Sequence, residues 1–257
     1  MKMKRAFCLV MLGLIVTVSQ CTLLAQDVPP TCLATVPDYA WEERFEEKKA
    51  QIAGGNVDLL FVGDSITHNW DDFGAEIRDY YYGDRKMVNM GFGGDKTQHI
   101  LWRLENSHLE KISPKVAVVM GGINNLMRVE NPLETPKNTA LGMKAVVDKI
   151  ESFYPDIKIL VLYTFPAADH PDHMFRARVA ESNAYLLDLL RDDPQVTLKD
   201  INYLWLNANS MIPIDIMPDS LHPNAYGYWL WAQTVEPEVA EMLGVPAKLV
   251  PALPEER

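Results

Sequence analysis

Cysteine is scarce in this chain: Cys8, Cys21 and Cys32 are the three among 257 residues. The first two fall in an N-terminal segment that we expect to be removed, so Cys32 alone would remain. No internal disulfide could then form. An apolar core must therefore hold the fold together, and a hydrophobic fraction of 48% is ordinary for one globular domain.

Basic residues are also few, at 24 against 35 acidic ones, which gives a formal net charge of −11. No basic cluster offsets this excess. Such an acidic surface repels nucleic acid and anionic membrane surfaces, so we exclude both as partners. The substrate is expected to be neutral or cationic, or to be held by a local patch.

One long apolar run opens the chain. Lys2, Lys4 and Arg5 precede apolar residues 6–18, and Ala25 offers a small residue for cleavage. This pattern is typical of a secretory signal peptide and is too short for a stable membrane span. We expect residues 1–25 to be a signal peptide and the mature protein to be periplasmic or extracellular, with lipid attachment through Cys21 as the alternative. Residues 26–250 would form a single domain and residues 251–257 a tail.

Apolar runs alternate with segments of helical periodicity along the rest of the chain. Their continuous Val, Ile and Leu content is typical of parallel strands covered on both faces, which predicts a three-layer α/β/α sandwich with a parallel sheet. Strands are expected at Val57–Val62, Lys86–Met90, Val116–Met120, Ile157–Tyr163 and Val196–Lys199. Helices are expected near Trp41–Ala53, Thr97–Leu109, Glu134–Phe153, Phe175–Leu190 and Tyr226–Leu243.

Polar, glycine-containing turns follow the first three expected strands: "GDS", "GFGGD" and "GGINN". Ligands of such sheets bind beyond the carboxyl ends of the strands. The three turns should therefore open onto one edge.

Ser65 lies in the first of these turns, and a candidate base lies far downstream. A serine hydroxyl needs a nearby base to become a nucleophile. In "DSLH", the spacing of Asp219 and His222 lets the carboxylate reach one ring nitrogen while the other faces the site, as in a Ser-His-Asp triad. Read separately, Ser65 could instead cap a helix, and the D-x-x-H stretch could be a surface turn.

Gly94 and Asn124 are the candidate donors for an oxyanion. Glycine permits close backbone approach, and the Gly94 N–H lies near an expected helix N-terminus, where negative charge is favoured. Asn124 could point its side-chain amide into the same space. Singly, the first could be a tight turn and the second a loop-capping amide. Together, the occurrence of these motifs in order at the ends of successive strands favours a functional site over unrelated turns.

The ordered set of Ser65, Gly94, Asn124 and the D-x-x-H pair Asp219 and His222 resembles the GDSL, or SGNH, hydrolase family. The segment "NMGFGGDKTQHILWRL" is most similar to the platelet-activating-factor acetylhydrolase type. Ile66 stands where the name-giving tetrapeptide has leucine. Asn125 replaces the aspartate of many members but follows the acetylhydrolase pattern.

The resemblance implies a flavodoxin-like sheet and a serine esterase that forms an acyl-enzyme. Ser65 would be the nucleophile, His222 the base and Asp219 its orienting partner, with Ser65, Gly94 and Asn124 forming the oxyanion hole. It implies no metal or cofactor. We expect a short-chain, acetyl-type ester of a carbohydrate as the substrate. A phospholipid-like ester, a thioester, a peptidoglycan-type acetyl group and a non-catalytic glycan-binding role remain as alternatives, and the oligomeric state is not predicted.

Several other residues could attract attention. His68 is expected at the pocket rim or in solvent, and His99 and His108 on the surface. His170 and His173, in "ADHPDHMF", are expected in a loop bordering the substrate entrance rather than at a metal. Trp70, Tyr80, Tyr81 and Tyr82 are expected to pack helices, with sugar stacking left open for Trp70, and residues 42–47 to form a solvated helix face.

Overall fold

A computed structural model describes residues 28–249 of the chain. The expected signal peptide, residues 1–25, and the expected tail, residues 251–257, lie outside the described residues. The strands are β1 (Leu59–Gly63), β2 (Met87–Gly91), β3 (Val116–Met120), β4 (Lys158–Leu162) and β5 (Val196–Lys199). The α-helices are α1 (Glu42–Ala53), α2 (Ser65–His68), α3 (Ala75–Tyr82), α4 (Thr97–Asn106), α5 (Ile123–Leu126), α6 (Pro136–Phe153), α7 (Met174–Leu190) and α8 (Ala225–Leu243). Short 3-10 helices are η1 (Pro30–Cys32), η2 (Asn69–Asp71), η3 (Leu109–Lys111) and η4 (Asn202–Trp205).

The five strands form one parallel sheet in the order β2-β1-β3-β4-β5. This is the flavodoxin-like order, so the predicted fold class is confirmed. Every residue of β1 and β3 is buried, as expected of central strands covered on both faces. Strand β5 is only partly buried because it lies at an edge of the sheet, which explains its weaker apolar signal.

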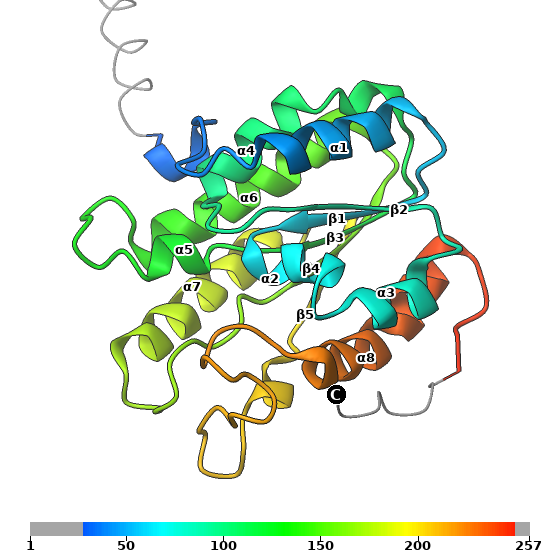
Figure 1. Cartoon of the computed structure of the whole chain (residues 1–257). Helices are drawn as coiled ribbons and strands as arrows, with labels where there is room; N and C mark the ends of the chain where they lie inside the picture. The colour runs from blue at the N-terminus through cyan, green and yellow to red at the C-terminus, as the bar shows by residue number, and fades with distance from the viewer. Residues whose placement is uncertain (1–27, 250–257) are drawn as a thin grey trace, which may run out of the picture.

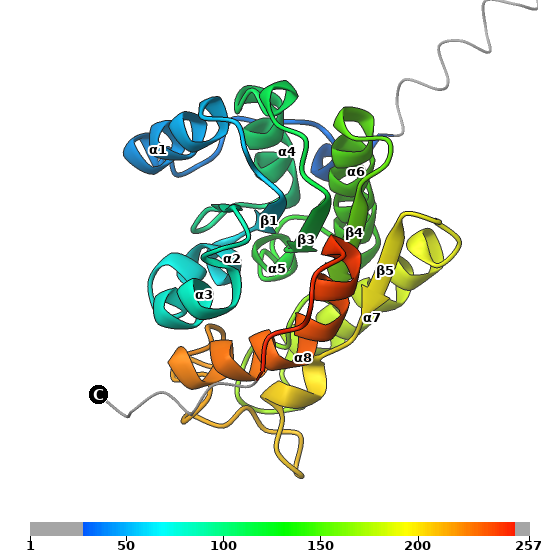
Figure 2. The ribbon, with the colours of Figure 1, turned by 90° about the vertical axis from the view of Figure 1, so that its right-hand side faces the viewer.

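Helices cover both faces of the sheet (Figures 1 and 2). Side chains of α1, α4, α6 and α7 share one core cluster with alternate strand residues such as Leu60 and Val119. On the other face, α3 and α8 pack against the intervening residues, such as Phe61 and Val118. The alternation of side chains along a strand sends each set to its own face.

Local capping sets the ends of the two longest helices. The Thr135 hydroxyl accepts a hydrogen bond from Asn138 N (3.1 Å), and Pro136 follows, so α6 begins after Thr135. Asn224 caps α8 by accepting from Gly227 N at 3.0 Å. This cap places α8 immediately after the expected His222 turn and so fixes the direction from which that turn approaches the sheet.

An aromatic cluster lies under the sheet beside α8. Trp70 is fully buried and contacts Tyr228 and Trp231 edge to face, with ring centroids 4.7 and 5.1 Å apart. Tyr81 and Tyr82 are also buried. These residues pack helices as predicted, and the buried ring of Trp70 has no face available for a sugar.

Candidate active site

The first three strands end side by side, which brings their turns to one edge. In the register, Gly63 at the end of β1 pairs with Gly91 of β2 and with Met120 of β3. Ser65, Gly94 and Asn124 follow these ends by two, three and four residues. The structure thus places the three predicted residues on the same carboxyl edge of the sheet.

Ser65 is the first residue of α2, but it does not cap that helix. The capping oxygen belongs to Asp64, whose Oδ1 accepts from Ile66 N at 3.0 Å. The alternative role for Ser65 is therefore wrong. Its hydroxyl instead lies 2.8 Å from Nε2 of His222, 157 residues further along the chain.

His222 is held between Ser65 and Asp219. Its Nδ1 lies 2.6 Å from Asp219 Oδ2, and the other carboxylate oxygen accepts the backbone N–H groups of Leu221 (3.1 Å) and His222 (2.7 Å). Partial burial opposes ionisation of Asp219, but the hydrogen bonds from His222 outweigh it and lower the pKa of the carboxyl. A carboxylate at Nδ1 favours a proton there, which leaves Nε2 to accept the Ser65 proton.

Two neighbouring segments position the His222 turn. Tyr228 on α8 donates to the carbonyl of Ile66 on α2 at 2.6 Å, which ties the helix that follows the His222 turn to the helix that begins at Ser65. The loop after β4 supports the other side, because Ala168 N donates to Ser220 O at 3.0 Å. This is the loop that contains His170 and His173.

The loop histidines make only local contacts among the described residues. His170 is exposed, and His173 caps α7 by accepting from Phe175 N at 3.3 Å. Over residues 28–249, no group of three or more His, Cys, Asp or Glu side chains is arranged to hold a metal ion.

Gly94 has a left-handed backbone, with φ of 78°, which few side chains tolerate. Just before it, the end of β2 approaches α2 so closely that a Cβ on Gly91 would lie 2.3 Å from His68 N. Phe92 N also donates to Gly63 O at 3.3 Å. The turn after β2 is thus packed directly on the start of α2.

Asn124, the second residue of α5, contacts the same turn. Its Nδ2 donates to the backbone carbonyl of Asp95 at 2.9 Å. A side-chain amide nitrogen carries two hydrogens, so one remains for a ligand. Asn124 is half-buried, and this single contact with Asp95 orients the amide.

A buried ion pair between Asp95 and Arg103 holds the turn that carries Gly94. Arg103 on α4 meets the Asp95 carboxylate through Nε (2.6 Å) and Nη2 (3.1 Å), and both side chains are 1% exposed. The guanidinium also lies 3.8 Å from the ring centroid of Phe92 and donates to the carbonyl oxygens of Tyr39 (2.9 Å) and Ala40 (3.1 Å). Burial raises the pKa of Asp95 to about 6, although the Arg103 hydrogen bonds act in the opposite direction.

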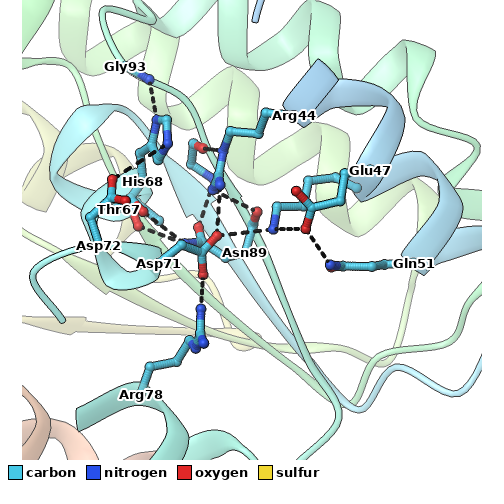
Figure 3. A network of polar contacts seen from close by, with 12 residues as sticks. Arg44, Glu47, Gln51, Thr67, His68, Asp71, Asp72, Arg78, Asn89 and Gly93 are labelled. Carbon is cyan, nitrogen blue, oxygen red and sulfur yellow. Dashed lines mark hydrogen bonds and ion pairs between the residues drawn. The ribbon is translucent and has the colours of Figure 1, made fainter. Parts of the chain in front are cut away.

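His68 was expected at the rim or in solvent, and the structure shows it to be a partly buried support. Its Nδ1 accepts from Gly93 N at 3.1 Å, within the turn that carries Gly94 (Figure 3). Burial, and then the nearby Arg44 charge, lower the pKa of His68 to about 4, so the ring is neutral and can accept this hydrogen bond.

His99 is a correction to the sequence analysis, because it is 3% exposed. The segment before α1 covers the outer side of α4, with Thr97 Oγ1 donating to Thr31 O (2.8 Å) and Thr35 N to Gln98 O (3.0 Å). His108 is exposed, as predicted, and so are the four glutamates of residues 42–47.

An ionic network lies next to the site on the outer side of β2 (Figure 3). Asp71 pairs with Arg44 (2.8 Å), Lys48 (3.0 Å) and Arg78. Burial opposes ionisation of Asp71, but Lys48 and Arg44 hold its pKa at about 2. A hollow of about 810 Å³ is lined by these four residues among others, but by neither Ser65 nor His222. The network joins α1 to α3, and within it Arg44 donates to the carbonyl of Gly91 at the end of β2 (3.0 Å).

Sequence reasoning missed three features of the site: the contact of His68 with Gly93, the Asp95–Arg103 pair, and the buried Asp64. The Asp95–Arg103 pair could have been predicted, because the two residues are spaced by about two turns of a helix and carry opposite charges. Asp64 is fully buried, and burial, reinforced by the Asp95 charge, raises its pKa to about 7. Over the described range, no helix is both long and apolar enough to cross a membrane.

Known proteins resemble this chain in sequence. Residues 61–230 match the GDSL-like lipase/acylhydrolase family. The platelet-activating factor acetylhydrolase IB subunit alpha2 of Rattus norvegicus is 37% identical over 171 residues, covering 66% of this chain and 71% of that protein. Subunit alpha1 of the same organism is 31% identical over 191 residues, covering 74% and 78%.

Solved structures share the fold at lower identity. A GDSL-like lipase from Bacteroides thetaiotaomicron has a TM-score of 0.62 at 15% identity, covering 77% of this chain and 97% of that one. An acetylxylan esterase from Geobacillus stearothermophilus has a TM-score of 0.57 at 15% identity, covering 76% and 98%. The family match over residues 61–230 and the sequence relatives show that the chain belongs to the GDSL-like lipase/acylhydrolase family of carboxylic ester hydrolases.

Proposed function

We propose that this protein is an exported serine esterase that removes short acyl groups, acetyl above all, from a neutral carbohydrate ester. The observation that carries the proposal is the continuous hydrogen-bonded chain from Ser65 through His222 to Asp219, at the edge where Gly94 and Asn124 also lie. Export is inferred from the charged and apolar pattern of residues 1–25.

The geometry supports acyl transfer in two steps. His222 Nε2 accepts the Ser65 proton as Oγ attacks the ester carbonyl, and Asp219 stabilises the imidazolium that forms. The backbone N–H groups of Ser65 and Gly94, with the free amide hydrogen of Asn124, stabilise the oxyanion. The protonated imidazole then gives its proton to the leaving alcohol.

Water releases the acyl group in the second step. His222 accepts a proton from water as the water oxygen attacks the acyl-enzyme, and returns it to Ser65 Oγ when the acid leaves. The same three side chains therefore serve both halves of the reaction. No step calls for a metal or a redox cofactor.

The acetyl preference is supported by the sequence relatives, which are platelet-activating factor acetylhydrolase subunits at 31–37% identity. The same relatives favour a second candidate, a phospholipid-like acetyl ester. We favour carbohydrate because the sequence shows no amphipathic lipid-docking segment and because the proposed export would bring the enzyme to polysaccharide.

The test compares substrates side by side. Purified protein is assayed on 4-nitrophenyl acetate, a longer-chain 4-nitrophenyl ester, an acyl thioester, O-acetylated oligosaccharides and an acetylated glycerophosphocholine, with Ser65→Ala as the blank. Turnover that falls with chain length and is faster on the oligosaccharide than on the phospholipid supports the proposal. Well-folded protein that hydrolyses none of these esters would refute it and leave a glycan-binding role.

A further inference from the structure

The segment that leads into α1 lies across the turn that carries Gly94. It is fixed at three points: Thr35 N donates to Gln98 O at 3.0 Å, Arg103 donates to the Tyr39 and Ala40 carbonyls, and Trp41 Nε1 donates to Gly93 O at 2.8 Å. The segment is thus held as an ordered wall beside the candidate oxyanion donors.

Two aromatic side chains of this wall, Tyr39 and Trp41, lie directly against the glycines of the turn. A Cβ on Gly94 would come within 2.6 Å of Tyr39 Cδ2 and Cε2, and a Cβ on Gly93 within 2.9 Å of Trp41 Cζ2. The nearest atoms of each ring belong to one edge. Tyr39 and Trp41 nevertheless remain 56% and 44% exposed as residues, so they contact the turn and are also accessible to solvent.

The backbone of Trp41 is unusual for an exposed residue. Its φ of 48° and ψ of 41° are left-handed, a conformation that is strained for a non-glycine residue. Its ring also meets His68 edge to face, with centroids 4.8 Å apart. The left-handed backbone of Trp41 thus holds a partly exposed indole against the turn that carries Gly94.

We propose that Tyr39 and Trp41 bind the alcohol part of the ester and that this part is a sugar ring. The inference rests on the proposed esterase function. In that reaction the carbonyl oxygen faces Gly94 N–H, and an acetyl group ends at its methyl carbon. The group that extends from the carbonyl to these rings is therefore the alcohol part.

The chemistry of the rings fits a sugar. A pyranose presents a face of C–H bonds that packs on an aromatic ring, and its hydroxyls remain at the edges, where the polar ends of Tyr and Trp side chains can hydrogen-bond. Rigid aromatic side chains also lose little conformational entropy on binding. The surrounding surface is acidic, with Asp38, Glu42 and Glu43 exposed, which suits a neutral ligand better than an anionic one.

The test measures the ratio of two kcat/KM values, for an acetylated xylo-oligosaccharide and for 4-nitrophenyl acetate. Tyr39→Ala and Trp41→Ala should each lower this ratio about tenfold, mainly through KM for the oligosaccharide. Tyr80→Ala is the matched control, because Tyr80 is 43% exposed on α3, on the opposite face of the sheet, and should leave the ratio unchanged. Trp41→Phe keeps an aromatic ring without the Gly93 hydrogen bond and should retain most of the ratio.

An equal loss on both substrates, or no loss on either, would overturn the inference, since the rings would then only support the turn or contact nothing. A loss confined to an acetylated glycerophosphocholine would also overturn it in favour of a choline site. Calorimetric binding of the unacetylated oligosaccharide to Ser65→Ala, with and without Trp41→Ala, separates this inference from the esterase proposal. Binding that depends on Trp41 without any turnover would refute only the latter.

Discussion

The substitution Arg103→Met tests how the turn that carries Gly94 is held in place. The substitution keeps an unbranched apolar stem over Phe92 but leaves the Asp95 carboxylate buried without its bidentate partner. Two backbone carbonyls, of Tyr39 and Ala40, lose their donor as well. The groups changed by this substitution support the turn and contact neither Ser65 nor His222.

The expected cost follows from the burial of both charges. Removing one partner of a buried pair costs about 3–5 kcal/mol, which is a large part of the roughly 5–15 kcal/mol that a domain has available. In urea unfolding monitored by circular dichroism, the midpoint should fall by about 1–2 M. The double variant Asp95→Asn with Arg103→Met removes both charges and should recover about 2 kcal/mol of the loss.

The pH dependence separates charge from packing. The pKa of Asp95 is already about 6 in the folded protein because of burial, and losing Arg103 should raise it further. An acid whose folded pKa is raised stabilises the fold at low pH and loses that contribution as pH rises. The loss of unfolding free energy caused by Arg103→Met should therefore be smaller near pH 5 than near pH 8. A deficit that is independent of pH, or a double variant no more stable than Arg103→Met, would refute the reasoning.

Three further predictions concern the reaction and a buried acid. Ser65→Ala and His222→Ala should each abolish nearly all hydrolysis of 4-nitrophenyl acetate, and combining them should add little, because the two act as a unit; additive losses would contradict this. Asn124→Ala should lower kcat by about 10²–10³, and an unchanged kcat would remove its amide from the oxyanion hole. Because the pKa of Asp64 is raised from 3.8 to about 7 by burial, its contribution to stability is lost as pH rises through that range. The free energy of unfolding in urea, taken as Asp64→Asn minus the natural chain, should therefore rise by on the order of 4 kcal/mol between about pH 4 and pH 8. A difference that does not change with pH would show that Asp64 is ionised throughout.

The sheet and the site were predictable to different depths. The continuous apolar runs predicted all five strands, since burial on both faces leaves a signal in the sequence itself, and Val116–Met120 matches β3 at both ends. The four-residue helices α2 and α5 are too short to show periodicity, and neither they nor α3 were among the expected helix ranges.

Within the site, rules about strand ends and short spacings placed the candidate residues on one edge, and the D-x-x-H turn has the local geometry that its spacing suggested. The supports could not be found this way. His68 reaches Gly93, and Arg103 reaches Tyr39, only because separate elements pack together. The prediction that His99 is exposed was wrong for the same reason, because the segment that covers α4 is distant from it in the chain.

The separation of 157 residues between the paired serine and histidine has a consequence for biogenesis. A polypeptide emerging from the ribosome or across a membrane contains the proposed nucleophile, Ser65, long before it contains the proposed base, His222. On the proposed mechanism it stays inactive until α8 docks and Tyr228 reaches the carbonyl of Ile66. The onset of hydrolysis should thus report completion of folding, and a product truncated before α8 would carry an intact serine but no activity.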